Sequence, residues 1–436
     1  MKTKRTARLP GFYRLSLDER LSRLVETGWL TEEEALAVGG PGAAGGFDRQ
    51  IADGMSENVI GVHGLPLGIC LNLRIDGVDR VAPMAVEEPS VVAAASNAAR
   101  LVREGGGFEV ETTEAVMAAQ VQIIHVREPT AATHRIAAEA PALLEAANAL
   151  MPRMVARGGG ARGLETRILQ GPEGRPSDTV CVHLLVDCLD AMGANLLNTV
   201  AEGLAPRLAA LAGGEPGLRI LSNYADRRLV RVSCRIPPEA LRSEAWPDGG
   251  LVRDRIVSAS RFAEMDPYRA VTHNKGLMNG IDAVLLATGQ DWRQAEAAAH
   301  AYAARQGSYG PLAVWRAGRD GFLEGLAELP LAVGTVGGAL RAHPGVRLGH
   351  RLARVSDARD LAGLAASVGL ASNLAALKAL ATEGIQRGHM GLHARTVAIE
   401  VGATGDEILQ VAARLQDEMC FELERARAIL AEVRGE

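Results

Sequence analysis

The stretch LLVDCLDAMGANLLNTVAE, residues 184–202, joins a predicted strand to a predicted helix. Its first half is an apolar run typical of a buried strand, and the apolar residues then recur at helical spacing. Small residues fill the turn between the two. Such a turn lets the backbone approach a phosphate at the N-terminus of the helix, but the G-x-G-x-x-G pattern of a Rossmann fold is absent.

Strands and helices alternate on both sides of this stretch. Strand patterns cover 116–126, 164–170, 179–188 and 218–224, and helical patterns cover about 131–157 and 194–212. This alternation is typical of a ferredoxin-like, split βαβ unit. We therefore predict an α+β fold in which residues 115–224 form a domain inserted into the chain.

The flanking segments predict a larger, α-rich domain made of residues 1–114 and 225–384. Long helical patterns with Ala and Leu at i, i+3 and i+4 cover 260–307 and 360–384. Residues 385–436 are predicted to form a separate C-terminal flap, in which the β-branched run TVAIEV, residues 396–401, favours a strand.

Composition narrows the class of protein. The chain has 436 residues, 47% of them hydrophobic, with a formal charge of −5 and only 3% aromatic residues. Scattered basic residues and few aromatics argue against a nucleic-acid partner. The five cysteines contain no CxxC pair, and we find neither a signal peptide nor a membrane span, so a cytoplasmic protein is expected.

Two histidines near the end of the chain, His389 and His393, are four residues apart. No H-E-x-x-H motif is present, so a metal site is disfavoured, and paired surface histidines are the ordinary alternative. The neighbouring arginines and glycines favour a cationic, flexible segment suited to an anionic ligand or a moving lid.

Three further groups could carry chemistry. Glu88 lies in a Glu-Glu-Pro-Ser sequence at a predicted helix start, where it is either a surface charge that complements the helix dipole or a catalytic acid. Lys275 is predicted at another helix start, where it is either solvated or able to stabilise an oxyanion. Asp291 is read most simply as an N-cap, with catalysis as the alternative.

Six motifs occur together and in order over nearly the whole chain: ENVIG (57–61), EEPS (87–90), DAMGAN (190–195), THNKGLMNGID (272–282), GTVGGA (334–339) and EGIQRGHMGLHAR (383–395). In this combination the chain resembles the class II, bacterial-type 3-hydroxy-3-methylglutaryl-CoA (HMG-CoA) reductases. The resemblance implies reduction of HMG-CoA to mevalonate and CoA by two hydride transfers from NAD(P)H, through mevaldyl-CoA and mevaldehyde.

The resemblance also implies roles for residues. The catalytic group would be Glu88, Lys275, Asp291 and His389, with Lys275 at the reacting oxygen, Glu88 as proton source, Asp291 tuning both and His389 protonating the CoA thiolate. The HMG group would contact Ser90, Arg269, Asn279 and Asn373, although this chain has Ser372 where the family pattern has Gln. The cofactor would contact Asp190, Met192, Gly193, Ala194, Asn195, Asn223 and Arg153.

The implied cofactor is NADPH or NADH, with no metal. NADH-using members carry an Asp shortly before the Gly-Gly-Gly of 158–160, where this chain has Met151, with Arg153 and Arg157 nearby. We therefore predict that NADPH is accepted. The family is dimeric, with active sites shared between subunits, so a homodimer or a higher assembly is expected.

Three alternatives remain at this point: a non-catalytic CoA-binding homologue, a metal-dependent acyl-CoA hydrolase that uses the histidine pair, and a Rossmann dehydrogenase. The presence of all four reactive groups disfavours the first. The missing metal motif and the missing glycine fingerprint disfavour the other two.

Overall fold

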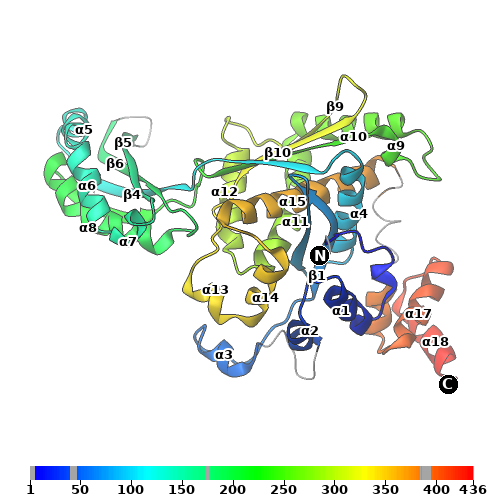
Figure 1. Cartoon of the computed structure of the whole chain (residues 1–436). Coiled ribbons are helices and arrows are strands. Elements are labelled where there is room, and N and C mark those ends of the chain that lie inside the picture. Colours follow the sequence, from blue (N-terminus) through cyan, green and yellow to red (C-terminus); the bar gives the residue numbers. More distant parts are fainter. Residues whose placement is uncertain (1–4, 40–46, 172–175, 383, 385–393, 436) are drawn as a thin grey trace.

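The structure is a computed structural model that describes residues 5–39, 47–171, 176–382, 384 and 394–435. The strands of this part form a six-stranded and a four-stranded sheet, each accompanied by helices (Figure 1). This mixture confirms the predicted α+β class.

The four-stranded sheet belongs to the predicted inserted unit. Its order is β5-β6-β4-β7, with every neighbouring pair antiparallel, and this is the ferredoxin-like order 2-3-1-4 when the strands are numbered within the unit. The elements are β4 (Val116–Ile124), α5 (Pro129–Ala138), α6 (Ala140–Ala149), α7 (Pro152–Val155), β5 (Gly160–Gln170), β6 (Pro176–Asp187), α8 (Ala194–Ala212) and β7 (Glu215–Leu221).

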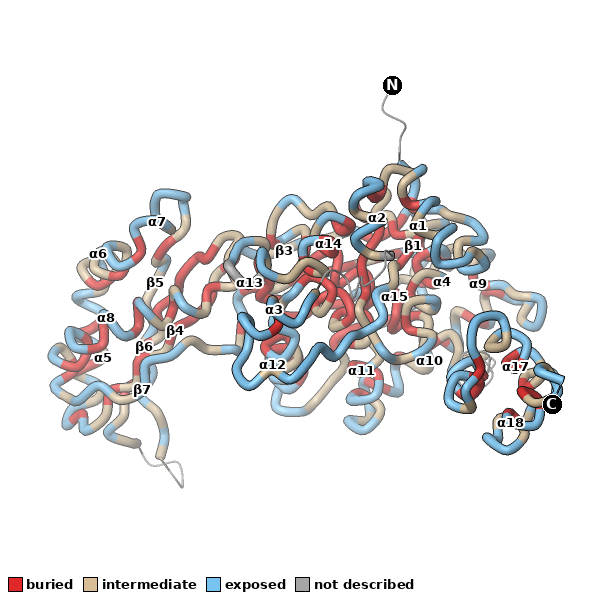
Figure 2. The backbone as a smooth tube through the Cα atoms, turned by 90° about the horizontal axis from the view of Figure 1, so that it is seen from below, coloured by how far each residue is buried: buried red, intermediate tan, exposed pale blue. Residues whose placement is uncertain are grey.

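The helical stretch expected over 131–157 is divided into three helices. A proline stands in the first turn of each of them, where its missing N–H costs no hydrogen bond. In β4, alternate residues such as Met117, Val121 and Ile123 are buried among the helices of this unit. Figure 2 shows this inner layer of buried residues at the end of the molecule that contains α5 to α8.

The six-stranded sheet belongs to the larger domain and has the order β2-β1-β3-β8-β10-β9. Its strands are β1 (Leu67–Ile75), β2 (Val78–Ala85), β3 (Phe108–Thr112), β8 (Leu229–Ile236), β9 (Ala313–Ala317) and β10 (Leu323–Pro330). The helices after β2 are α4 (Val91–Glu104), α9 (Pro238–Leu241), α10 (Gly249–Met265), α11 (Pro267–Ala287), α12 (Trp292–Ala303), α13 (Gly338–Ala342), α14 (Pro344–Ala353) and α15 (Ala358–Ala381).

Helix α15 is the centre of the larger domain. It packs against α4, α10, α11 and the strands β3 and β8. Its length and its mean hydropathy of 1.5 would allow it to cross a membrane, but 67% of that window is buried inside the protein. Its apolar character is therefore that of a core helix.

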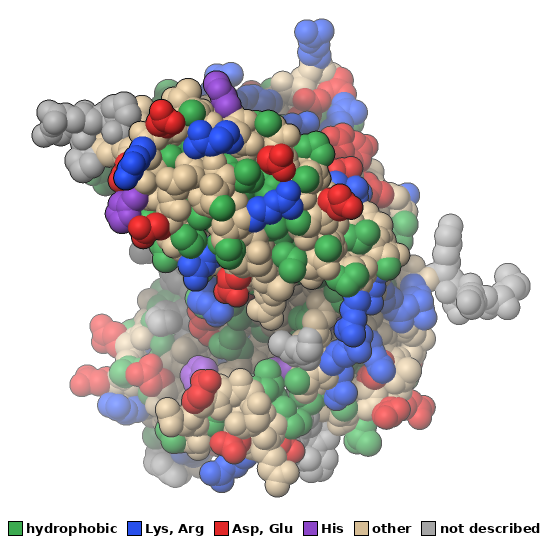
Figure 3. Space-filling view, turned by 90° about the vertical axis from the view of Figure 1, so that its left-hand side faces the viewer, with side chains coloured by type: hydrophobic (Ala, Val, Ile, Leu, Met, Phe, Trp, Pro, Cys, Tyr) green, Lys and Arg blue, Asp and Glu red, His purple; other side chains and the backbone are tan. Residues whose placement is uncertain are grey.

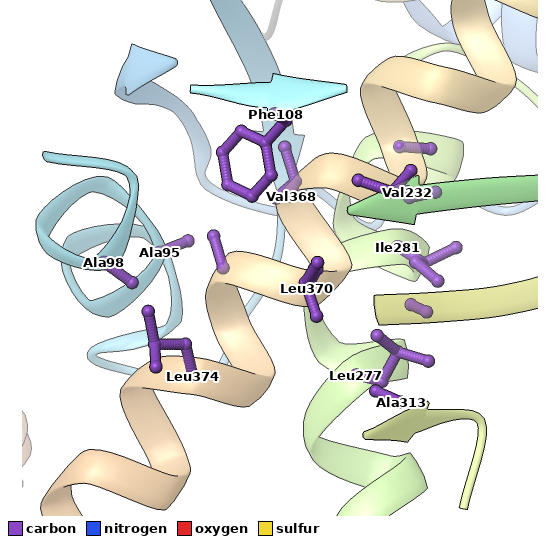
Figure 4. Packing of buried hydrophobic residues seen from close by; sticks show 14 of the residues in the cluster. Ala95, Ala98, Phe108, Val232, Leu277, Ile281, Ala313, Val368, Leu370 and Leu374 are labelled. Carbon is purple, nitrogen blue, oxygen red and sulfur yellow. The ribbon is translucent and has the colours of Figure 1, made fainter. Parts of the chain in front are cut away.

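Helices α11 and α15 approach each other through glycines. A Cβ added at Gly280 would lie 2.6 Å from the carbonyl oxygen of Val368, and one at Gly369 would lie 2.6 Å from the Ile281 side chain. Around this contact, Leu277 and Ile281 of α11 and Leu370 of α15 belong to one buried cluster (Figure 4). The close packing fixes both helices, which carry the candidate site.

The N-terminal elements form a small cluster beside β1 and β2. They are a short 3-10 helix (Phe12–Arg14), α1 (Leu17–Glu26) and α2 (Glu32–Gly39). The short helix α3 (Arg49–Asp53) comes next in the chain. Two helices end the chain, α17 (Asp406–Asp417) and α18 (Leu423–Arg434), at the opposite end of the molecule from the inserted unit (Figure 1).

The strand predicted over 396–401 was wrong, because residues 394–400 are helical. Ala394, Val397 and Ala398 are buried with residues of α17 and α18, and Val401 packs against this cluster. The spacing i, i+3, i+4 and i+7 is that of one helix face, and it outweighs the strand preference of the β-branched residues. The end of the chain therefore has a small helical core of its own, while the predicted domain boundaries stay predictions.

Candidate active site

A charged pair joins two distant parts of the sequence. Nζ of Lys275 in α11 donates a hydrogen bond of 2.8 Å to Oε2 of Glu88, which lies in the loop between β2 and α4. Their side chains are 59% and 39% exposed, so both groups can reach a ligand. The predicted proximity of these two residues is thus observed.

The predicted position of Lys275 at a helix start was wrong. Helix α11 begins at Pro267, and the side chain of its N-cap Asp266 accepts hydrogen bonds from the N–H groups of Tyr268 and Arg269. Lys275 lies two turns further along the helix, beyond the first-turn N–H groups that carry the positive end of the helix dipole. The positive charge that Lys275 offers to a ligand therefore comes from its own ammonium group and not from the helix dipole.

The pair opens into a cavity of about 550 Å³. Its walls come from α4, α11 and the C-terminal half of α15, and they include apolar residues such as Ala94 and Leu377. Six of the residues predicted for catalysis or HMG binding line this one cavity: Glu88, Ser90, Arg269, Lys275, Asn279 and Asn373. Residues 269, 272, 276 and 279 follow one face of α11, which explains how one helix supplies so much of the cavity wall.

Arg269 is one of the cations that line the cavity, with Lys275 and Lys378. Partial burial lowers the pKa of its guanidinium. Within the described residues no carboxylate or carbonyl pairs with its guanidinium, so no protein group there offsets its desolvation. An arginine in this state favours a carboxylate ligand, which its planar fork binds with two hydrogen bonds.

Asn373 is held firmly by the protein. Its Oδ1 accepts from Nε1 of Trp315 at 2.9 Å, and its Nδ2 donates to the carbonyl oxygen of His273 at 3.0 Å. Burial lowers the pKa of His273 to about 4, so its imidazole is neutral at physiological pH. Asn373 thus couples α15 to α11 and β9 at the cavity wall.

The DAMGAN turn precedes the N-terminus of α8. Gly193 has φ +105°, and a Cβ there would lie 2.5 Å from Sγ of Cys188, so glycine is required. Leu189 is also left-handed, with φ 50°. Met192, Ala194 and Asn195 follow the predicted path into the helix, whose N-terminus favours an anion.

The backbone of this turn is joined to the larger domain. The N–H of Thr335 donates to the carbonyl oxygen of Asp190 at 2.9 Å, and the N–H of Ala358 donates to Oδ1 of Asp190 at 3.1 Å. The Asp190 carboxylate thus lies at the start of α15. This contact gives Asp190 a structural role at the junction in addition to its predicted cofactor contact.

Asp291 lies with the cofactor residues instead of with the charged pair. It caps α12 by accepting from the N–H of Gln294 at 3.1 Å, and the side chain of Gln294 donates to the carbonyl oxygen of Asn223 at 2.9 Å. In the described part of the chain no hydrogen bond or ion pair joins Asp291 to Glu88 or Lys275, and the cavity wall does not include it. The N-cap interpretation is therefore observed, and the shared network is not formed within this single chain.

Three further predicted residues are His389, His393 and Arg153. His389 and His393 fall outside the described residues. Among those that are described, no three His, Cys, Asp or Glu side chains are grouped so as to hold a metal. Arg153 is exposed in α7, next to the buried Met151.

Comparison with known proteins decides the family. A family profile described as hydroxymethylglutaryl-coenzyme A reductase matches residues 16–394. The 3-hydroxy-3-methylglutaryl-coenzyme A reductase of Archaeoglobus fulgidus is 45% identical over 430 residues, which cover 99% of this chain and 95% of that protein. The chain belongs to the hydroxymethylglutaryl-coenzyme A reductase family.

Solved structures agree with this assignment. The HMG-CoA reductase of Streptococcus pneumoniae superposes with a TM-score of 0.82 at 40% identity, covering 98% of this chain and 99% of that one. A class II HMG-CoA reductase from the same organism, bound to NADPH in open conformations, gives a TM-score of 0.80 at 41% identity, covering 96% and 100%. The resemblance to HMG-CoA reductases is confirmed, and the chain is an oxidoreductase of this family.

The sequence did not reveal two residues that position parts of this site. Trp315 orients Asn373, and Arg228 holds the DAMGAN turn from behind. Neither lies in one of the six motifs. A lone Trp or Arg on a strand pattern carries no signal of its partner, because the partner is more than thirty residues away in sequence.

Proposed function

We propose that this chain reduces HMG-CoA to mevalonate and free CoA with two molecules of NADPH. The observation that carries the proposal is the Lys275–Glu88 pair, 2.8 Å apart, in a cavity that Arg269 also lines. The cavity thus offers one cation for the carboxylate of the HMG group and a second for the thioester oxygen. The NADPH-bound relative supports the choice of reductant.

In the first step a hydride from NADPH adds to the thioester carbonyl carbon, and negative charge develops on its oxygen. The Lys275 ammonium stabilises this charge, and Glu88, whose Oε2 accepts a hydrogen bond from Nζ, is proposed as the source of the proton once it is itself protonated. The resulting hemithioacetal, mevaldyl-CoA, gives its hydroxyl proton back to Glu88 as the C–S bond breaks, which leaves mevaldehyde and the CoA thiolate. A second hydride and a second proton then give mevalonate.

The departing thiolate needs a proton, because it would otherwise add back to the aldehyde. His389 is proposed as that acid, on the basis of its place in the EGIQRGHMGLHAR motif. Replacing it by Gln would slow HMG-CoA reduction and spare mevaldehyde reduction.

Substrate and cofactor residues are assigned on the same basis. Arg269, Ser90, Asn279 and Asn373 would bind the HMG group. The DAMGAN turn would hold the pyrophosphate at the N-terminus of α8. Arg153 would bind the 2′-phosphate of NADPH, because Met151 offers no carboxylate to repel that phosphate.

We further propose a cytoplasmic homodimer with shared active sites. Within one chain, the cofactor turn and Asp291 form one group of residues and the Glu88–Lys275 cavity forms another. A partner subunit would bring the first group of one chain to the second group of the other. Four buried free thiols, among the five cysteines of the described chain, fit a reducing compartment.

The test follows the oxidation of NADPH by the absorbance of its nicotinamide ring, with HMG-CoA as substrate and mevalonate identified as product. NADH is assayed in parallel. Thiol release without NADPH oxidation would contradict the proposal and favour a hydrolase, and binding of HMG-CoA without turnover would favour a non-catalytic homologue.

A further inference from the structure

Arg228 is a buried cation whose side chain reaches the cofactor turn from behind. It follows the loop that leaves the inserted unit and precedes β8, and it is 5% exposed. Nη1 donates to the carbonyl oxygen of Ala191 at 2.9 Å, and Nη2 donates to that of Leu189 at 3.3 Å. One guanidinium thus holds the backbone on both sides of Asp190.

The same guanidinium also binds the larger domain. Nη2 donates to the carbonyl oxygen of Val333 at 2.6 Å. Next to Val333, a Cβ added at Gly334 would lie 2.8 Å from the backbone nitrogen of Met192. The turn therefore contacts both Arg228 and the segment 333–335, and a side chain at position 334 would collide with it.

The partners of Arg228 are neutral. All three hydrogen bonds go to backbone carbonyls, and the nearby Asp187 pairs with Arg162 at 2.9 Å instead. Burial lowers the pKa of Arg228, which reflects the cost of keeping this charge away from water. The nearby carboxylates of Asp187 and Asp190 offset part of this cost, and an anion bound at the N-terminus of α8 would offset more of it.

We propose that Arg228 is a positioning residue for the dinucleotide: it fixes the DAMGAN turn in its binding shape and ties it to segment 333–335 of the larger domain. This inference rests on the proposed function of the turn as the NADPH site. Binding of NADPH then depends on a residue that does not touch it, and the orientation of the nicotinamide toward the substrate is set at the same junction.

The test measures the Kd of NADPH by isothermal titration calorimetry on the full chain. Arg228→Met leaves three carbonyls unpaired and is expected to weaken NADPH binding by about tenfold or more. HMG-CoA binding, measured separately, should change little, because its proposed residues lie in the other group. The matched control is Arg227→Met, whose neighbouring guanidinium pairs with Glu165 on the surface at 2.8 Å.

Two further variants keep the proposal testable if Arg228→Met does not fold. Arg228→Lys retains the charge but not the fork, and it should still weaken NADPH binding. Gly334→Ala disturbs the turn from the opposite side and should weaken it without changing any charge. A lower Tm with an unchanged Kd for NADPH in these variants, or full rescue by Arg228→Lys, would overturn the positioning role.

Failure of the inference differs from failure of the proposed function. If the unmodified enzyme binds and oxidises NADPH while the Arg228 and Gly334 variants bind it equally well, only the inference is wrong. If the unmodified enzyme does not bind NADPH, the proposed function is wrong and the inference falls with it.

Discussion

At the scale of single residues, the ammonium group of Lys275 is the one on which hydride transfer depends. Replacing Lys275 by Ala removes the donor to the developing oxyanion and is expected to lower kcat about 10²-fold or more. Both half-reactions, of HMG-CoA and of mevaldehyde, should suffer, because each places negative charge on the same oxygen. Stopped-flow or steady-state measurement of NADPH oxidation with each substrate checks this.

The matched control for Lys275→Ala is Lys378→Ala, which removes a lysine from the wall of the same cavity on α15. Its kcat should stay within a few-fold of the unmodified enzyme, since the observed partner of Glu88 is Lys275. Equal losses of kcat in the two variants would mean that only the general positive potential of the cavity matters.

A second residue-scale prediction concerns Asp282 in α11. Burial and the neighbouring Glu296 carboxylate raise its pKa from the ordinary 3.8 to about 9, and its Oδ1 has no hydrogen-bond partner among the described residues. The folded protein then keeps a proton that the unfolded chain releases above pH 3.8. Stability contributed by this group is full below that pH and is lost as the pH rises toward 9.

Asp282→Asn removes this dependence, because the amide stays neutral. The Tm of the variant minus the Tm of the unmodified enzyme should be larger at pH 8 than at pH 5, two values roughly within that window. Differential scanning calorimetry at both values checks it, with the exposed Asp254→Asn of α10 as control. A Tm difference that is the same at both pH values would show that Asp282 titrates normally.

At the residue scale the sequence was informative where chemistry sits in a motif. Glu88 and Lys275, each in one of the six motifs, were predicted to share a site, and they line one cavity. Arg228 could not be predicted, because its role depends on three carbonyls from two other segments of the chain. Backbone partners leave no residue type by which a sequence pattern could reveal them.

At the scale of elements, the close approach of α11 and α15 shapes the cavity. Gly280→Ala would place a Cβ 2.6 Å from the Val368 carbonyl oxygen, so the helices must separate. We expect a loss of about 1–3 kcal/mol in the free energy of unfolding. Urea denaturation followed by circular dichroism gives this value.

Gly276→Ala is the matched control on the same helix, one turn earlier. There the added Cβ would lie 3.7 Å from Cβ of Ala376, an ordinary contact. Its stability should be unchanged or higher by up to about 1 kcal/mol, because Ala favours a helix over Gly. Equal destabilisation by both substitutions would refute the close-contact explanation.

The order of elements was easier to predict than their ends. The ferredoxin-like order followed from periodicity alone, and the observed strand order 2-3-1-4 agrees with it. The start of α11 was misplaced, because the Asn-Lys-Gly sequence looked like a cap while the actual cap is Asp266-Pro267. The segment 396–401 was misassigned because burial against α17 and α18 decides its conformation, and those contacts are not local.

At the scale of the whole molecule, two parts of the surface differ in character. At the end formed by the inserted unit, acidic and basic side chains are interspersed among hydrophobic ones (Figure 3). In the segment 60–67 several apolar residues are exposed, among them Ile60, which is 95% exposed and belongs to the ENVIG motif. This distribution supports a contact with a second subunit through the larger domain.

The proposed dimer makes a specific prediction, because it places Lys275 of one subunit opposite Asp291 of the other. Lys275→Ala and Asp291→Asn should each be nearly inactive as homodimers; Asn is chosen because it can still cap α12. Unfolding and refolding an equal mixture gives half heterodimers, each with one intact site and one doubly altered site. Activity should therefore return to about a quarter of that of the unmodified enzyme. If both residues served one site within a single subunit, every heterodimer site would carry one substitution, and the mixture would stay inactive.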